Sequence, residues 1–196
     1  ATVQGDLDFV KLEAWYAGMQ NTFDSYTLAA TSNIDLAESA NLGLELRHVG
    51  LKLDQEYAKN AGTIYNRVNP DALERDNAMT RLSIDGKFSI VNARLAYTMT
   101  DKDGGLTALD QDAKNTSLGW FISSNGIADA DYFQAALGVD ILDNLNLTGH
   151  YGQLKADGSD KKTINNAVKF GTIGYDQELK QQEVYGQLTY KMSKNL

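Results

Sequence analysis

The sequence predicts an all-β protein: an antiparallel up-and-down β-barrel that crosses a membrane, with short turns at one end and long loops at the other. Three observations support this prediction. Runs of about ten residues alternate between apolar and polar side chains, as strands with two different faces do. Such runs meet at short turns that contain Asn or Asp. The chain has only one proline, Pro70, which falls in a loop-like stretch outside these runs.

The clearest unit is a predicted hairpin at residues 133–155. Its first strand places an apolar residue at every second position, namely Phe133, Ala135, Leu137, Val139 and Ile141. Asp143 and Asn144 form the turn, and the alternation then resumes at Leu145, Leu147, Gly149 and Tyr151. Each strand is long enough to cross a bilayer, since about 9–11 tilted residues suffice.

The remaining strands are predicted from the same alternation. They lie at residues 6–19, 23–34, 41–56, 78–87, 89–100 and 182–192, and with the hairpin they make eight strands. Residues 35–41 form a turn, and residues 58–77 form a polar loop around Asn69-Pro70-Asp71. Residues 156–181 are ambiguous because residues 168–173 alternate, but a long outer loop is the preferred interpretation.

Composition excludes several classes of function. The formal net charge is −8 and no basic cluster occurs, which argues against nucleic acid as a partner. Cysteine is absent, so disulfides, zinc–thiolate sites and thiol nucleophiles are excluded. No apolar run reaches the ~18 residues of a transmembrane helix. The chain contains no nucleophile elbow, phosphate loop or zinc-protease motif, and it is predicted not to be an enzyme.

The polar faces of three neighbouring predicted strands combine basic and acidic residues. If Leu42, Leu44 and Leu46 face lipid, the alternation turns the residues between them inward. The same rule applied to the next two strands predicts five pore-lining residues: Glu45, Arg47, Arg81, Asp85 and Arg94. Opposed charges inside a pore set its ion preference. Ion pairs that fill a narrow lumen are the alternative interpretation.

The longest break in the alternation, residues 101–131, is predicted to fold into the barrel as a constriction loop. Its candidate constriction residues are Asp110, Asp112, Trp120 and Phe121. Asp101 and Asp103 belong to the same acidic stretch and suggest a calcium site, because hard cations prefer several carboxylate oxygens. Leu106 stands where a calcium loop needs glycine, so a solvated acidic loop is favoured and no other cofactor is expected.

With its strands laid out, the chain resembles a Gram-negative outer-membrane porin. The resemblance rests on the strand–turn–strand units at Tyr132–Gln153 and Glu183–Leu196, and it is nearest to the epsilonproteobacterial major outer membrane protein and the OprD-like channels. It implies periplasmic turns, contact with the lipid bilayer and lipopolysaccharide, and location in the cell outer membrane. It also implies a homotrimer of barrels with about 16–18 strands, through which ions and small hydrophilic solutes diffuse passively.

Alternative architectures remain open from the sequence. Residues 1–196 are expected to form a single β-barrel domain, and the similarity of Ser193–Leu196 to Leu142–Leu145 predicts an internal portion of a larger barrel. A closed eight-stranded structural or adhesive membrane barrel is the main alternative. A soluble β-barrel binding module is less favoured, because runs of about 12–16 residues exceed the usual 5–6 of soluble strands. Strand number separates the two membrane hypotheses, since about eight strands leave a filled lumen.

Overall fold

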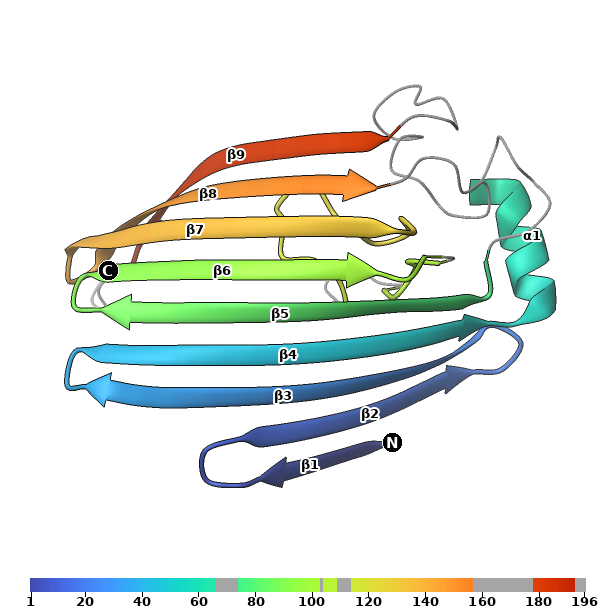
Figure 1. The fold of residues 1–196 in the computed structure, drawn as a ribbon, viewed down its shortest axis with the longest axis horizontal. Coiled ribbons are helices and arrows are strands. Elements are labelled where there is room, and N and C mark those ends of the chain that lie inside the picture. The colour runs from blue at the N-terminus through green and yellow to red at the C-terminus, as the bar shows by residue number, and fades with distance from the viewer. Residues whose placement is uncertain (66–73, 103, 109–113, 157–177, 193–196) are drawn as a thin grey trace.

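A computed structural model of the chain describes residues 1–65, 74–102, 104–108, 114–156 and 178–192. Within these residues, nine strands form one antiparallel sheet in which each strand pairs with its neighbours in the sequence (Figure 1). The predicted all-β, up-and-down architecture is confirmed. The strands are β1 (Thr2–Asp6), β2 (Lys11–Met19), β3 (Phe23–Ala37), β4 (Ala40–Leu53), β5 (Asp76–Phe88), β6 (Val91–Thr100), β7 (Ala130–Leu142), β8 (Leu145–Ala156) and β9 (Leu179–Tyr190).

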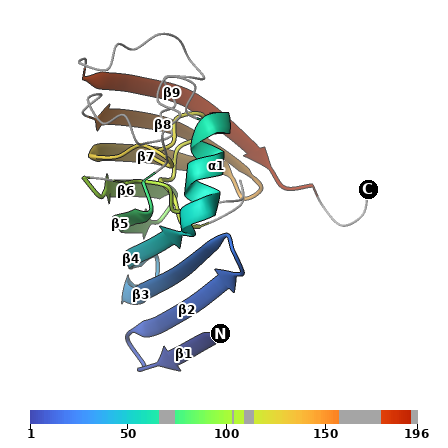
Figure 2. The same cartoon turned by 90° about the vertical axis from the view of Figure 1, so that its right-hand side faces the viewer.

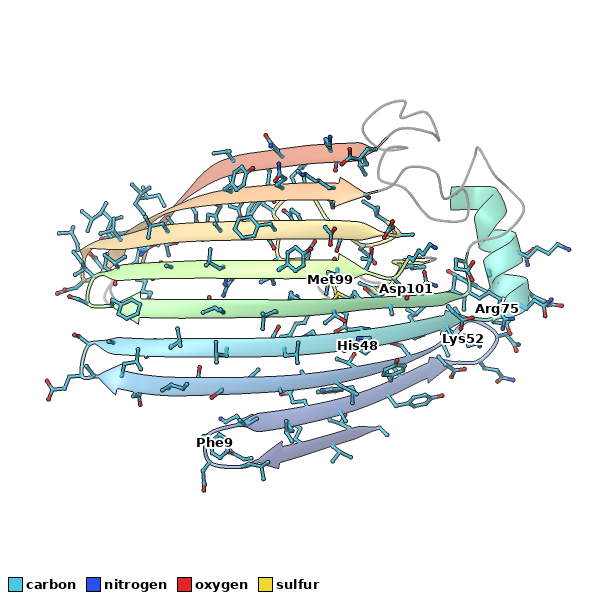
Figure 3. The ribbon with its side chains drawn as sticks, in the orientation of Figure 1. Phe9, His48, Lys52, Arg75, Met99 and Asp101 are labelled. Carbon is cyan, nitrogen blue, oxygen red and sulfur yellow. The ribbon has the colours of Figure 1, made fainter. Side chains whose placement is uncertain are left out.

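The two ends of the sheet differ in their connections. Tight turns at residues 7–10, 38–39, 89–90 and 143–144 lie at one end, here called the turn end. The opposite loop end carries the long connections, including residues 54–75 and 101–129, together with the short β2–β3 turn. Figure 3 labels Phe9 at the turn end and Lys52, Arg75 and Asp101 at the loop end. The predicted asymmetry between short turns and long loops is therefore present.

The sheet is curved (Figure 2). Its two faces have opposite character. The alternation turns large apolar side chains to the convex face, where Leu95 keeps 51% of its surface exposed. This convex belt continues across the sheet as Leu12, Leu28, Leu46, Leu82, Tyr97, Phe133, Leu137, Leu147 and Leu188, all of them exposed. The concave face carries the polar residues of the same strands. The predicted lipid-facing stripes therefore form one continuous surface.

The described residues of the loop at 101–129 pack on the concave side of the sheet, where they are drawn in yellow-green to yellow (Figure 2). Beneath them lies a buried apolar cluster of Ile122, Ile127, Ala130, Tyr132, Leu154, Ala156 and Leu179. This cluster joins the loop to β7, β8 and β9. The concave face is thus filled near the loop end, and the convex belt remains uncovered.

The prediction of eight strands is wrong at the beginning of the chain. The strand predicted at residues 6–19 starts at the last residue of β1, and its next four residues form a tight turn, so that only its second part is a strand, β2. Strand β1 itself was not predicted. In this turn the Leu7 N–H donates to the Val10 carbonyl at 2.9 Å, and Asp8 has a φ of 60°. Aspartate tolerates that left-handed conformation better than most residues do. Leu7, Phe9 and Val10 gave the turn an apolar sequence, which concealed it.

The polar loop predicted at residues 58–77 is wrong in its first part, where helix α1 (Gln55–Tyr65) forms. Asp54 caps the helix, because its Oδ1 accepts the Glu56 N–H at 2.8 Å. Ala58 is buried beside Leu51 and Leu53, which holds the helix over the loop end of β4. Residues 66–73, including Pro70, lie outside the described residues. No helix in the described part of the chain is long and apolar enough to span a membrane.

The two edges of the sheet are β1 and β9. Within the described residues these strands do not pair with each other, so the sheet is open and already has nine strands. This contradicts the closed eight-stranded alternative. Strand β9 begins at Leu179, three residues before its predicted start. Most of the ambiguous segment, residues 157–177, lies outside the described residues.

We expect a charged residue on the convex belt to destabilise the protein in a bilayer. Leu95→Arg places a cation midway along β6 and should lower the free energy of unfolding in lipid vesicles by about 2–4 kcal/mol. Asn92→Arg, on the concave face of the same strand, is the matched control and should cost less than about 1 kcal/mol. Urea titration of both variants checks this. Equal losses would show that the convex face does not contact acyl chains.

Candidate functional site: the concave face and its loop

All five predicted pore-lining residues lie on the concave face of the sheet, on three adjacent strands. Glu45 and Arg47 come from β4, Arg81 and Asp85 from β5, and Arg94 from β6. Strand register places Arg47 opposite Arg81 and Asp85 opposite Arg94. The five residues therefore form two groups, which differ in burial and in their distance from the loop end.

The first group is a buried charge cluster of Glu45, Arg47 and Arg81. The Glu45 carboxylate accepts hydrogen bonds from Arg81 Nη2 at 2.5 Å and from Arg81 Nε at 3.2 Å. Its second oxygen accepts one from Arg47 Nη2 at 3.4 Å. Arg81 keeps only 3% of its surface exposed and Arg47 5%. Two cations share one carboxylate, so this cluster needs further acceptors to be stable.

The loop supplies those acceptors. Arg81 Nη1 donates to the backbone carbonyls of Lys114 at 2.9 Å and Thr116 at 2.5 Å. Arg47 Nη1 donates to the Asn115 side chain at 3.4 Å, and Asn115 Nδ2 donates to Thr27 Oγ1 at 3.0 Å. Side chains of β3, β4 and β5 thus bind three consecutive loop residues. The cluster anchors residues 114–116 of the loop to the wall.

The second group is open to solvent. Arg94 Nε donates to Asp85 Oδ1 at 2.5 Å, and the side chains keep 48% and 43% of their surface exposed. Lys87 and Asp140 form a similar pair at 3.2 Å with exposures of 52% and 32%. Both pairs lie nearer the turn end, where the loop makes no described hydrogen bond to the wall. Such exposed pairs contribute little to stability, and their charges remain accessible to solvent.

The base of the loop is fixed by close backbone packing against the sheet. Asn77 Oδ1 accepts the Leu106 N–H at 3.0 Å, and the Ala78 N–H donates to the Gly104 carbonyl at 3.1 Å. A Cβ on Gly105 would collide with the Ile127 carbonyl, so only glycine allows the two arms of the loop to meet. The loop is therefore directed inward from its first residues.

The described part of the predicted constriction loop has its two aromatic residues at the surface. Trp120 keeps 77% of its surface exposed, and Phe121 is also largely exposed. The Trp120 ring lies 5.8 Å from the Tyr185 ring of β9, and Tyr185 stacks on His150 of β8 at 4.3 Å. Neither aromatic residue is part of the buried cluster.

The acidic candidates are only partly described. Asp103, Asp110 and Asp112 lie outside the described residues, and Asp101 follows the end of β6. Among the residues that the structure describes, no group of three His, Cys, Asp or Glu side chains could hold a metal ion. The calcium site therefore stays a prediction.

Sequence reasoning missed the residues of β7 and β9 that bind residues 118–122 of the loop. Gln134 Oε1 accepts the Leu118 N–H at 2.8 Å, and Glu183 accepts the N–H groups of Trp120, Phe121 and Ile122. A signal was present, because the alternation that turns Val184 outward turns Glu183 inward. What the sequence lacks is any sign of which loop atoms these side chains meet.

Comparison with known proteins identifies the fold. No family model and no curated protein matches the sequence. Among solved structures, the outer membrane protein OprD from Pseudomonas aeruginosa matches with a TM-score of 0.70 and 18% identity, over 96% of this chain and 48% of that chain. Acinetobacter baumannii OccAB3 gives a TM-score of 0.70 and 16% identity, over 96% of this chain and 43% of its own.

Pseudomonas aeruginosa OccK10 (OpdN) gives a TM-score of 0.72 at 12% identity, over 99% of this chain and 50% of that chain. The chain therefore spans half or less of the length of these proteins. It has the fold of that part of their barrels, which confirms the predicted resemblance to OprD-like proteins as a resemblance of fold.

We expect Glu45 to be essential for stability. Glu45→Gln leaves two buried arginines without a carboxylate and should lower the free energy of unfolding by about 3 kcal/mol. Asp85→Asn removes the same charge from an exposed pair and should cost less than about 1 kcal/mol. Urea titration of the folded protein in detergent compares the two variants. A small and equal loss in both would contradict the role assigned to the buried cluster.

Proposed function

We propose that the protein is an outer-membrane porin that allows ions and small hydrophilic solutes to diffuse passively through a charged lumen. One observation supports this most directly: a curved sheet combines an apolar convex belt with a polar concave face that a loop covers in one half and leaves open in the other. No chemical step is involved. The structural matches support the same assignment through the fold.

The convex belt favours a bilayer over water as the surroundings of this sheet. A soluble binding module would need a second sheet or helices to cover Leu82, Leu95, Leu137 and their neighbours, and no described element does so. In an outer membrane the turn end would face the periplasm, and the loop end would meet lipopolysaccharide. A homotrimer is part of this proposal, because the sequence resembles trimeric porins.

The mechanism is restricted diffusion. The loop of residues 101–129 narrows the lumen near the loop end, where its base and its anchors fill the concave face. Solutes then pass the exposed pairs Arg94–Asp85 and Lys87–Asp140, whose charges act on the passing ion. The buried cluster around Arg81 contributes to the position of the loop rather than to contact with solutes.

A larger structural barrel whose lumen is plugged by ion pairs and carries no open channel is the second candidate, and the buried cluster favours it. Glu45, Arg47 and Arg81 with their loop partners occupy space that an open pore would leave to water. This candidate requires that the far half of the wall close against the loop. It predicts a folded, inserted protein that carries no current.

The decisive experiment is single-channel recording of the purified full-length protein in a planar bilayer. We expect stepwise ohmic currents, and steps in groups of three would support the homotrimer. Silence from protein that is shown to be folded and inserted would overturn the open-channel proposal and favour the structural barrel.

The open pairs should set ion preference in opposite directions. Arg94→Gln removes a lumen cation, so the reversal potential in a salt gradient should shift toward cation preference. Asp85→Asn removes the facing anion and should shift the potential toward anions, because the field of the pore follows its uncompensated charge. Each variant is the control of the other. If neither moves the reversal potential, solutes do not pass these residues.

A further inference from the structure

Glu183 lies on the edge strand β9 and connects it to the middle of the loop. Its Oε1 accepts the Trp120 N–H at 3.1 Å and the Tyr132 hydroxyl at 2.5 Å. Its Oε2 accepts the Phe121 N–H at 2.9 Å and the Ile122 N–H at 3.2 Å. One carboxylate thus satisfies three consecutive backbone donors and one hydroxyl. Bonds to a charged acceptor are roughly twice as strong as neutral ones.

Two glycines leave space for this carboxylate. Gly152 of β8 lies opposite Glu183 in the register, and a Cβ there would come within 3.0 Å of Glu183 Cγ. A Cβ on Gly119 would collide with the Ile122 carbonyl and the Tyr132 hydroxyl, and would lie 2.7 Å from Glu183 Oε1. Any larger residue at either position would displace the loop or the carboxylate. Ile122 and Tyr132 belong to the buried apolar cluster, which keeps water from one side of these bonds.

Binding of the backbone at residues 120–122 also decides where the side chains point. Ile122 is buried against the wall, whereas Trp120 and Phe121 are exposed. Trp120 lies against Tyr185, two residues beyond Glu183 toward the turn end and so toward the open charged pairs. If the backbone were released, Trp120 would lose the support that holds its ring beside Tyr185.

We propose that Glu183 is the positioning residue of the constriction: its carboxylate holds residues 120–122 against the wall and fixes the exposed Trp120 and Phe121 side chains in the lumen. This deepens the proposed function and rests on it for its effect on conduction. The loop is then held from two sides by opposite charges. Arg81 binds the carbonyls of Lys114 and Thr116, and Glu183 binds the N–H groups of residues 120–122.

Glutamine is the informative replacement. Glu183→Gln keeps the size of the side chain but has one acceptor oxygen in place of two, and its amide N–H₂ faces the donors that the second oxygen served. At least one pair of the four donors therefore loses its acceptor. Asp85→Asn is the matched control, since it removes a carboxylate from the same face without touching the loop.

The first readout is the mobility of Trp120. The chain has two tryptophans, so Trp15→Phe leaves Trp120 as the only one. We expect its fluorescence anisotropy to decay slowly, with the whole particle, in this background. Addition of Glu183→Gln should cause loss of that slow component, and addition of Asp85→Asn should leave it unchanged. A folded Glu183→Gln protein with the slow component intact would overturn the proposal.

A second variant keeps the test decisive if Glu183→Gln does not fold. Gly119→Ala retains every charge but pushes residues 119–122 off the wall, and it should cause the same loss of the slow component. Retention of that component in Gly119→Ala would also overturn the proposal.

The second readout is open-channel current noise in a planar bilayer, which should rise in Glu183→Gln. The two proposals can fail separately. If the native protein carries no current while Trp120 is released by Glu183→Gln, the porin proposal fails and the role of Glu183 in holding the loop stands. If current flows and Trp120 does not respond, the role of Glu183 fails alone.

Discussion

Because successive side chains of a strand point to opposite faces, an apolar convex belt obliges the same strands to turn their polar residues inward. The chain repeats this choice on neighbouring strands, so Glu45, Arg81 and Arg94 meet on one concave wall while Leu46, Leu82 and Leu95 meet on the other side. A lone buried arginine on that wall would be costly. The inner face therefore needs a second layer of polar atoms wherever water does not reach it, and the loop of residues 101–129 is that layer.

The loop satisfies this need with its backbone more than with its side chains. Arg81 binds two of its carbonyls, and Glu183 binds three of its N–H groups. A loop laid over a wall has few regular backbone partners of its own, and every buried backbone group must find one. The charged side chains of the wall and the backbone groups of the loop both need hydrogen-bond partners, and each supplies the partners of the other. These hydrogen bonds act together with the buried apolar cluster that joins the loop to β7, β8 and β9.

The sequence predicts which face of the sheet a side chain occupies, but not which loop atoms it contacts. Alternation placed Glu45, Arg81 and Arg94 on the concave face, since the face depends only on parity along a strand. It missed the turn at Leu7–Val10, because apolar turn residues imitate a strand, and it missed α1, although Asp54 offered an N-cap signal. It also missed Glu183, because three of the four donors to that carboxylate are backbone N–H groups some sixty residues away, and backbone atoms leave no trace in a sequence.

Arg81 and Arg94 show why parity cannot assign function by itself. They are the same residue type on the same face of adjacent strands, and each is paired with a carboxylate. Arg81 is enclosed by loop carbonyls and is 3% exposed, whereas Arg94 lies beyond the reach of the described loop and its side chain is 48% exposed. The first cation stabilises the contact with the loop, and in the proposed porin the second is the one that solutes would meet. Net charge summed over the inner face therefore says little about ion preference. What matters is the charge that the loop leaves uncovered, and the path of the loop decides it.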